Sequence, residues 1–401
     1  MKLYFFFFSL YLLSEIKVFA IEEILKPGRN AKAMALNGQL SETTSAAVFY
    51  NPAILTGSSG LTVDAELNLT SLNYRYEENG DFADASLNSI ITPVFLGVRY
   101  QTNTLGTFSG FILPRGAFKR VRVNNLPLTV DQQQISLDAV QYNRSLRFGG
   151  SYSIAWHPKL RLGLGVSFDL DQEQVELFGD QDAPTLILDH SGLFWGYHFG
   201  LAYQLLPKLH LGLSYHSELN KDFRSRTRLI GGLADEELNA YHFLPAQFNA
   251  SLKAQLSRVE AFLEYSFRAY AEGRNKRRTG LSVFDGRERN LQNTQDIGFA
   301  LKGQLEDFLI SAGYRFEEGA VGPGSFLPSG DLDTSGIQMG ADLDYLDRHR
   351  FSVGCQYFEI PQLQLSLSLT EGRHMVDQTR PAGGSYKLSI INLGISYSSK
   401  L

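Results

Sequence analysis

Residues 61–70 read LTVDAELNLT, and every second side chain in this stretch is apolar. Successive side chains of a β-strand point to opposite faces, so a period of two predicts a strand with one apolar and one polar face. The same period returns at LRLGLGVSFD (160–169), at LQLSLSLT (363–370) and in the final residues INLGISYSSKL (391–401). The chain after residue 60 is therefore expected to be all-β.

The connections between these alternating stretches are short and long in turn. Short ones include HPKL (157–160), LPKL (206–209) and IPQL (360–363), whereas the polar stretches between them run to roughly 10–30 residues. An even number of antiparallel strands, with short turns at one end and long loops at the other, is typical of a transmembrane β-barrel of the bacterial outer membrane.

The pattern predicts a barrel of about 14 strands. Residues 334–346 fit either a strand or a loop, and we place them in a loop because the number of strands is then even. The expected strands are 61–76, 89–100, 105–115, 140–156, 159–171, 191–205, 208–218, 245–256, 259–270, 292–304, 307–317, 347–359, 362–372 and 387–401.

Composition narrows the class of protein. Hydrophobic residues make up 43% of the 401 residues, which is too few for a bundle of membrane helices but suits a barrel in which every second strand residue faces lipid. The net charge of -5 gives no support for nucleic-acid binding. The single cysteine, Cys355, excludes an intrachain disulfide and a multi-cysteine metal site. We expect no metal and no cofactor.

The N-terminus predicts export. Lys2 precedes an apolar run from residue 3 to residue 13, and small residues, Val18 and Ala20, stand where a signal peptidase cleaves. We interpret residues 1–20 as a signal peptide, residues 21–60 as an apolar, alanine-rich segment before the first strand, and residues 61–401 as the barrel.

If the apolar register faces lipid, the opposite register defines the inner face. A charged Arg or Lys on the lipid face would cost roughly 2–4 kcal/mol near the bilayer centre, so charges fix the register. The inward cations then include Arg147, Lys253, Arg268 and Arg315. Two interpretations stay open for them: they bind a carboxylate head group of a ligand, or they form salt bridges with inward acids such as Glu260, Glu264 and Asp169.

Many inward positions are glycine, and this pattern also has two interpretations. Glycine in a strand often marks the close approach of another backbone, which would mean that something fills the lumen. Alternatively, glycine only lets the strands coil around the barrel. Residues 21–60 are the candidate filler. The inward glycines are Gly97, Gly149, Gly163, Gly165, Gly196, Gly200, Gly212, Gly298, Gly313, Gly354 and Gly394.

The stretches GRNAKAMALNG (28–38) and SAAVFYNPAIL (45–55), in which Asn51, Pro52 and Ala53 form a triplet before the first strand, resemble the FadL-type outer-membrane transporters of fatty acids and other hydrophobic compounds. The stretch DRHRFSVGCQYF (347–358) is similar to the third-last strand of that family. The sequence departs from the family at Thr43-Thr44, where an acidic pair is usual, and at Leu401, where an aromatic residue is usual.

The resemblance implies a barrel with an N-terminal plug inside its lumen, and a plug that joins the wall at the Asn51, Pro52, Ala53 triplet. It also implies passive uptake of a hydrophobic ligand, such as a fatty acid, that leaves through a lateral opening at a kinked third strand. In this sequence that strand is 105–115, and Gly106, Gly110 and Pro114 are the candidate kink residues.

Three functions remain open at this stage. The first is transport of hydrophobic small molecules. In that case the bilayer surrounds the wall, and lipopolysaccharide contacts basic loop clusters at 119–120, 224–228, 274–278 and 287–289. The second is a structural or adhesive barrel that acts through long extracellular loops. The third is a lipid-modifying enzyme, which Ser214 and His216 on one strand would suggest. We expect that the protein is not an enzyme.

Apolar runs at 175–178 and 186–188, which we expect in a long loop, have two interpretations as well: they capture greasy ligands, or they pack the loops on one another.

Overall fold

The computed structural model describes residues 27–42, 44–55, 59–78, 81–102, 105–114, 121–130, 133–178, 184–229, 236–271, 292–320, 347–375 and 385–400. The expected signal peptide and residues 334–346 lie outside this part of the chain, so those two predictions stay predictions. Among the described residues, no helix has the length and apolar character needed to cross a bilayer.

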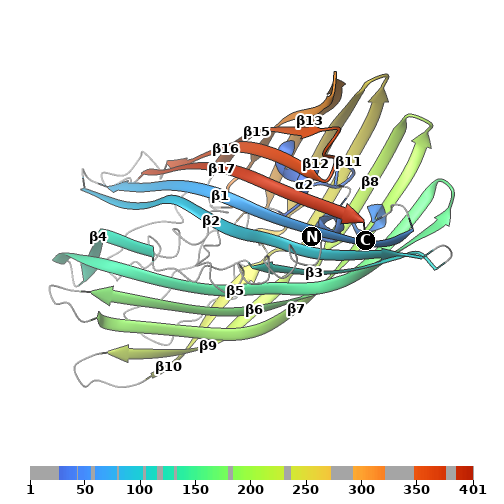
Figure 1. Ribbon diagram of the computed structural model, residues 1–401. Helices are drawn as coiled ribbons and strands as arrows, with labels where there is room; N and C mark the ends of the chain where they lie inside the picture. The colour runs from blue at the N-terminus through green and yellow to red at the C-terminus, as the bar shows by residue number, and fades with distance from the viewer. Residues whose placement is uncertain are drawn as a thin grey trace.

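The described strands form one antiparallel sheet that closes on itself (Figure 1), because β1 pairs with both β2 and β17. The strands are β1 (Gly60–Glu78), β2 (Asp81–Gln101), β3 (Thr107–Pro114), β4 (Val121–Val130), β5 (Gln133–His157), β6 (Leu160–Phe178), β7 (Pro184–Leu206), β8 (Leu209–His216), β9 (Leu219–Leu229), β10 (Glu236–Leu244), β11 (Gln247–Leu256), β12 (Val259–Arg268), β13 (Thr294–Leu305), β14 (Phe308–Glu317), β15 (Asp347–Tyr357), β16 (Leu363–Met375) and β17 (Ser385–Lys400).

Three pairs of these segments each fill a single position in the wall. β3 and β4 both pair with β5, β8 and β9 both pair with β7, and β10 and β11 pair with β9 and β8. The wall therefore has 14 strand positions, and the predicted 14-stranded antiparallel barrel is confirmed. Closure gives most strand positions a partner on both sides, which limits the sheet edge available for pairing with another chain.

Strand length is where the sequence-based prediction was wrong. Residues 77–88 were expected to form a loop, but only residues 79 and 80 separate β1 from β2. The apolar runs at 175–178 and 186–188 lie in β6 and β7, where Val175 is opposite Leu188. These strand ends carry no strict alternation in the sequence. We attribute this to the absence of a lipid face beyond the bilayer, which leaves the backbone ladder to hold the pairs together.

The side chains alternate as the register predicts. On β15, Phe351 and Val353 are about half exposed, at 52% and 51%, whereas Arg348 and Arg350 on the opposite face are buried, at 0% and 5%. The exposed apolar residues thus form the outer surface, and the charged residues line the inside.

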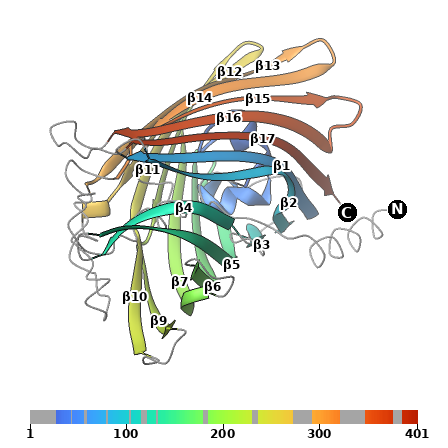
Figure 2. The ribbon, with the colours of Figure 1, turned by 90° about the vertical axis from the view of Figure 1, so that its left-hand side faces the viewer.

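Residues 27–55, which we call the internal segment, lie within the ring of strands (Figure 2). The segment contains the short helix α2 (Arg29–Ala33) and two 3-10 turns, η1 (Ser45–Phe49) and η2 (Pro52–Ile54). Side chains cap both turns: the Ala46 amide donates to Thr44 and the Ala53 amide donates to Asn51. Such caps satisfy amides that the first turn leaves without a partner.

Candidate functional site

The internal segment packs against the wall mainly at positions where the wall residue is glycine. Eight of the eleven inward glycines would place a Cβ within 4 Å of an atom of this segment: Gly97, Gly163, Gly200, Gly212, Gly298, Gly313, Gly354 and Gly394. At Gly313 the added carbon would lie 1.8 Å from the carbonyl oxygen of Met34. The internal segment therefore lies against the wall at most of these positions, and its backbone makes the close approach at four of them, Gly163, Gly200, Gly313 and Gly354. The other three of the eleven glycines face atoms of the wall itself.

The Asn51, Pro52, Ala53 triplet docks on β6 and β7. The Asn51 amide Nδ2 donates to the carbonyl oxygen of Leu201 at 3.0 Å, and Gly163 and Gly200 leave the room that the triplet needs. β1 begins only at Gly60, so the triplet is an anchoring turn against the wall and precedes the entry into the first strand.

We expect Asn51→Ala to lower the free energy of unfolding by about 1–2 kcal/mol, because the variant loses both the cap and the bond to Leu201. Equilibrium unfolding of the purified barrel in urea would measure this change. Limited proteolysis tests the anchoring role directly. Asn51→Ala should make the internal segment accessible to proteases, whereas the control Leu205→Ala, on the outer face of the same strand β7, should not. Equal protease sensitivity of the two variants would contradict the anchoring role.

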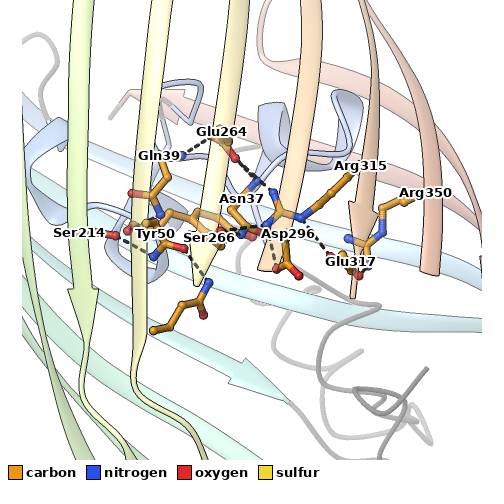
Figure 3. A network of polar contacts seen from close by, with 12 residues as sticks. Asn37, Gln39, Tyr50, Ser214, Glu264, Ser266, Asp296, Arg315, Glu317 and Arg350 are labelled. Atoms are coloured by element: carbon orange, nitrogen blue, oxygen red, sulfur yellow. Dashed lines mark hydrogen bonds and ion pairs between the residues drawn. The ribbon is translucent and has the colours of Figure 1, made fainter. Parts of the chain in front are cut away.

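Glutamates hold the first half of the internal segment. Glu264 on β12 accepts hydrogen bonds from the backbone amides of Asn37 at 2.6 Å and Gln39 at 2.8 Å (Figure 3). Glu66 on β1 accepts from the Gly28 amide at 2.8 Å and lies 2.7 Å from the Lys32 ammonium group. Bonds to an ionised acceptor are stronger than neutral ones, so both carboxylates act as firm attachment points.

Tyr50 ties the two halves of the segment together, since its hydroxyl donates to the carbonyl oxygen of Pro27. Burial, with a smaller effect of nearby carboxylates such as Glu42, raises the pKa of Tyr50 well above its ordinary value. The phenol therefore keeps the proton that it donates.

A ladder of charges crosses the inner face from β12 to β15 (Figure 3). Arg268 lies 2.7 Å from Asp296, and Arg315 lies 3.1 Å from the same carboxylate and 3.2 Å from Glu317. Arg348 continues the ladder at 3.1 Å from Glu317. Arg315, at its centre, is fully buried.

The other two candidate head-group contacts also have acidic partners on the wall. Arg147 forms a bidentate pair with Asp169, at 2.5 and 2.6 Å, and Lys253 lies 2.5 Å from Glu260. All four cations singled out in the sequence thus form salt bridges, which is the second of the two interpretations. The structure brings Arg268 and Arg315 together at Asp296, whereas Arg147 on β5 and Lys253 on β11 pair with other acids.

The wall divides at the third strand. β2 and β3 pair from Gln101 opposite Thr107 up to Leu96 opposite Ile112, and beyond this point the described pairing of β2 with β4 is a single pair, Asp84 with Asn124. We call the place where the two strands separate, bordered by Phe95 and Leu113, the fork.

The candidate kink residues lie at different distances from the fork. Gly106 has a φ of 99° in the turn before β3, a conformation that favours glycine. Gly110 lies in the regular ladder opposite Val98 and Gly150. Pro114 is the last residue of β3 and pairs only with Leu146 of β5, so it marks the separated side.

An apolar cluster covers the inner side of the fork. Phe95, Phe111 and Leu113 pack against the internal segment, among others against Val48 of η1 and Ile54 of η2. The Phe49 ring lies between the two wall aromatics, with ring centroids 5.9 Å from Phe95 and 4.2 Å from Phe111. The sequence analysis missed this cluster. The sequence does contain a signal for this cluster, because Phe95 and Phe111 are large apolar residues at inward positions, in a register that is otherwise polar.

The side chains that suggested an enzyme have other partners. Ser214 accepts a hydrogen bond from Asn249 at 3.0 Å, and His216 faces the backbone carbonyl of Tyr50 at 3.2 Å. Among the described residues, no group of three or more His, Cys, Asp or Glu side chains is arranged to hold a metal ion. The basic clusters at 119–120, 274–278 and 287–289 lie outside the described residues, and of 224–228 only the backbone, within β9, is described.

The fold is similar to that of solved structures of a FadL homologue and of toluene transporters. A FadL homologue from Pseudomonas aeruginosa superposes with a TM-score of 0.69 at 13% identity, covering 95% of this chain and 99% of its own. The Pseudomonas putida toluene transporter TodX gives 0.66 at 17% identity, with 96% and 100% covered. The Ralstonia pickettii toluene transporter TbuX gives 0.65 at 13% identity, with 94% and 99% covered.

The resemblance to FadL-type proteins is thereby confirmed at the level of the fold. No protein-family model and no curated protein matches the sequence.

Proposed function

We propose that this protein spans the bacterial outer membrane and carries uncharged hydrophobic small molecules inward by passive diffusion, with the fork as a lateral exit. The observation that carries the proposal is the apolar cluster, which lies where the wall separates between β2 and β3. The apolar cluster gives an apolar molecule at the fork a surface to bind before it enters lipid.

The charges of the lumen favour a neutral ligand over a carboxylate. The four candidate cations are paired with wall acids, whereas the fork is lined by apolar side chains. A carboxylate ligand could bind one of these cations only if the cation left its acidic partner, and this separation costs free energy. A hydrocarbon ligand binds without that separation. The similar solved structures named as toluene transporters agree with this class of ligand.

The first experiment measures uptake of labelled toluene and of a labelled long-chain fatty acid in cells with and without the gene. We expect faster uptake of toluene in cells with the gene and a smaller difference for the fatty acid. Equal uptake of both compounds with and without the gene would reject transport.

The second experiment tests the fork. In a Cys355→Ser background, Phe95→Cys with Leu113→Cys would place two thiols where the next strand pair would form, and oxidation would close the fork. We expect oxidation to reduce toluene uptake several-fold and a reductant to restore it. The control joins Val98→Cys and Gly110→Cys, which are already opposite each other in the ladder, and should leave uptake unchanged. A verified disulfide at the fork with normal uptake would exclude this exit.

A structural or adhesive barrel is the second candidate function. The buried charge ladder on β12 to β15 favours it, because such a network stiffens the wall and is not needed for apolar transport. Absence of uptake for every apolar compound, together with loss of envelope integrity in cells without the gene, would support this alternative.

A further inference from the structure

Phe49 holds an unusual place in the apolar cluster. Its ring meets Phe95 at an interplanar angle of 75° and Phe111 at 60°, both edge-to-face arrangements. Aromatic rings prefer this arrangement, and it adds an attraction beyond that of buried area alone. Phe95 and Phe111 are nearly fully buried, at 2% and 5%. A six-membered ring therefore fits between these two wall residues, and Phe49 supplies it.

Phe49 is also less enclosed than the rest of its turn. Ala46, Ala47 and Val48 are fully buried, whereas Phe49 is only partly buried. The ring thus contacts the wall on one side and keeps part of its surface open. This is the position of a side chain that can leave its site without rearranging the whole turn.

The polar attachments of the internal segment lie on both sides of η1. Glu264 holds the part before η1 through Asn37, and Asn51 holds the part after it through Leu201. Within η1, the backbone amide of Ser45 donates a hydrogen bond to the Asp64 carboxylate of the wall, at 2.7 Å. A small movement of η1 would withdraw Phe49 while both ends of the segment stay in place.

We propose that Phe49 occupies a ring-sized binding site between Phe95 and Phe111, and that an aromatic ring of the transported molecule takes this site when Phe49 withdraws. This inference rests on the proposed function, since it names the residue that selects the ligand at the fork. An aromatic ligand recovers both edge-to-face contacts, whereas a saturated ring of the same size recovers only the apolar contact. The site therefore selects monocyclic aromatic compounds over cycloalkanes.

The direct test empties the site. Crystals of Phe49→Ala are soaked in bromobenzene, and the bromine is located by its anomalous signal. We expect the ligand ring to lie about 5 Å from the Phe95 and Phe111 rings, because an apolar cavity of this size stays dry and accepts an aromatic guest. Bromocyclohexane under the same conditions should give a much weaker bromine signal.

Val48→Ala is the matched control, because it removes apolar volume from the same turn but not from between the two rings. It should show no bromine at the site. If Phe49→Ala fails to fold, Phe49→Leu provides a smaller vacancy for the same soak. A folded Phe49 variant without ligand at the site, or equal occupancy in Val48→Ala, would overturn the inference.

Uptake separates this inference from the proposed function. Phe49→Ala should raise toluene uptake several-fold over the wild-type protein and keep a preference for toluene over cyclohexane, because Phe95 and Phe111 stay in place. If the wild-type protein takes up toluene but Phe49→Ala leaves the rate unchanged or shows no preference for toluene, this inference fails and transport stands. If the wild-type protein takes up no apolar compound while bromobenzene still binds, transport fails and the site stands.

Discussion

Gly313→Val is expected to open the lumen to small hydrophilic solutes. A Cβ at this position would lie 1.8 Å from the carbonyl oxygen of Met34 and 2.6 Å from its carbonyl carbon, so the backbone of the internal segment must move away from β14. Backbone atoms cannot turn aside as a flexible side chain does. Forced overpacking of this kind costs typically about 1–3 kcal/mol, and here the displaced segment is what fills the barrel.

The measurement is single-channel conductance in planar bilayers, together with the sensitivity of cells to a hydrophilic antibiotic. We expect frequent open events for Gly313→Val and a closed wild-type barrel. Gly303→Val is the control, since Gly303 lies on the outer face of the neighbouring strand β13 and its added carbon would meet Val259 at an ordinary 3.4 Å. Closed channels in Gly313→Val would mean that the internal segment does not seal the lumen.

Arg315→Met should give the largest loss of stability. Arg315 is fully buried and lies 3.1 Å from Asp296, 3.2 Å from Glu317 and 3.6 Å from Glu264. Removing one partner from a buried ion network leaves charge without compensation, which costs about 3–5 kcal/mol. Because Glu264 also binds the Asn37 and Gln39 amides, the loss should loosen the internal segment as well.

Urea unfolding in lipid vesicles would measure the free-energy difference for this variant. Glu260→Gln is the control: Glu260 and Lys253 form a pair that is 28% and 25% exposed, and a pair of this kind contributes only about 0–1 kcal/mol. A change of less than about 1 kcal/mol for Arg315→Met would show that the ladder does not stabilise the barrel.

The class of fold was readable from the sequence because lipid imposes a strict rule on one face of each strand. Where that rule applies, as at Leu363 to Thr370, the predicted and observed strands coincide closely. Where it does not, as at 77–78 and 81–88, the residues form strand with no apolar alternation to reveal it. The glycine pattern is likewise visible in the sequence, but a filled lumen was only one of its two interpretations.

The candidate site was predicted less well. The sequence identified Arg268 and Arg315 as inward charges, but their common partner, Asp296, lies on β13, and the register of that strand against β12 and β14 decides that they share it. Proline at position 114 pointed to the third strand, yet the extent of the fork depends on where β2 stops pairing with β3. Neither fact has a local signal in the chain.

The sequence by itself determined the barrel and the inner and outer faces of its strands, because both follow from local alternation, whereas it left open whether the inward glycines mark a filled lumen. Only the tertiary structure decided which residues meet inside. Phe95 and Phe111 meet because β2 and β3 are consecutive strands of one hairpin, and Phe49 joins them because the internal segment packs against this hairpin. A contact of that kind depends on the stagger of the strands and on the path of the internal segment, and neither is encoded at a single position.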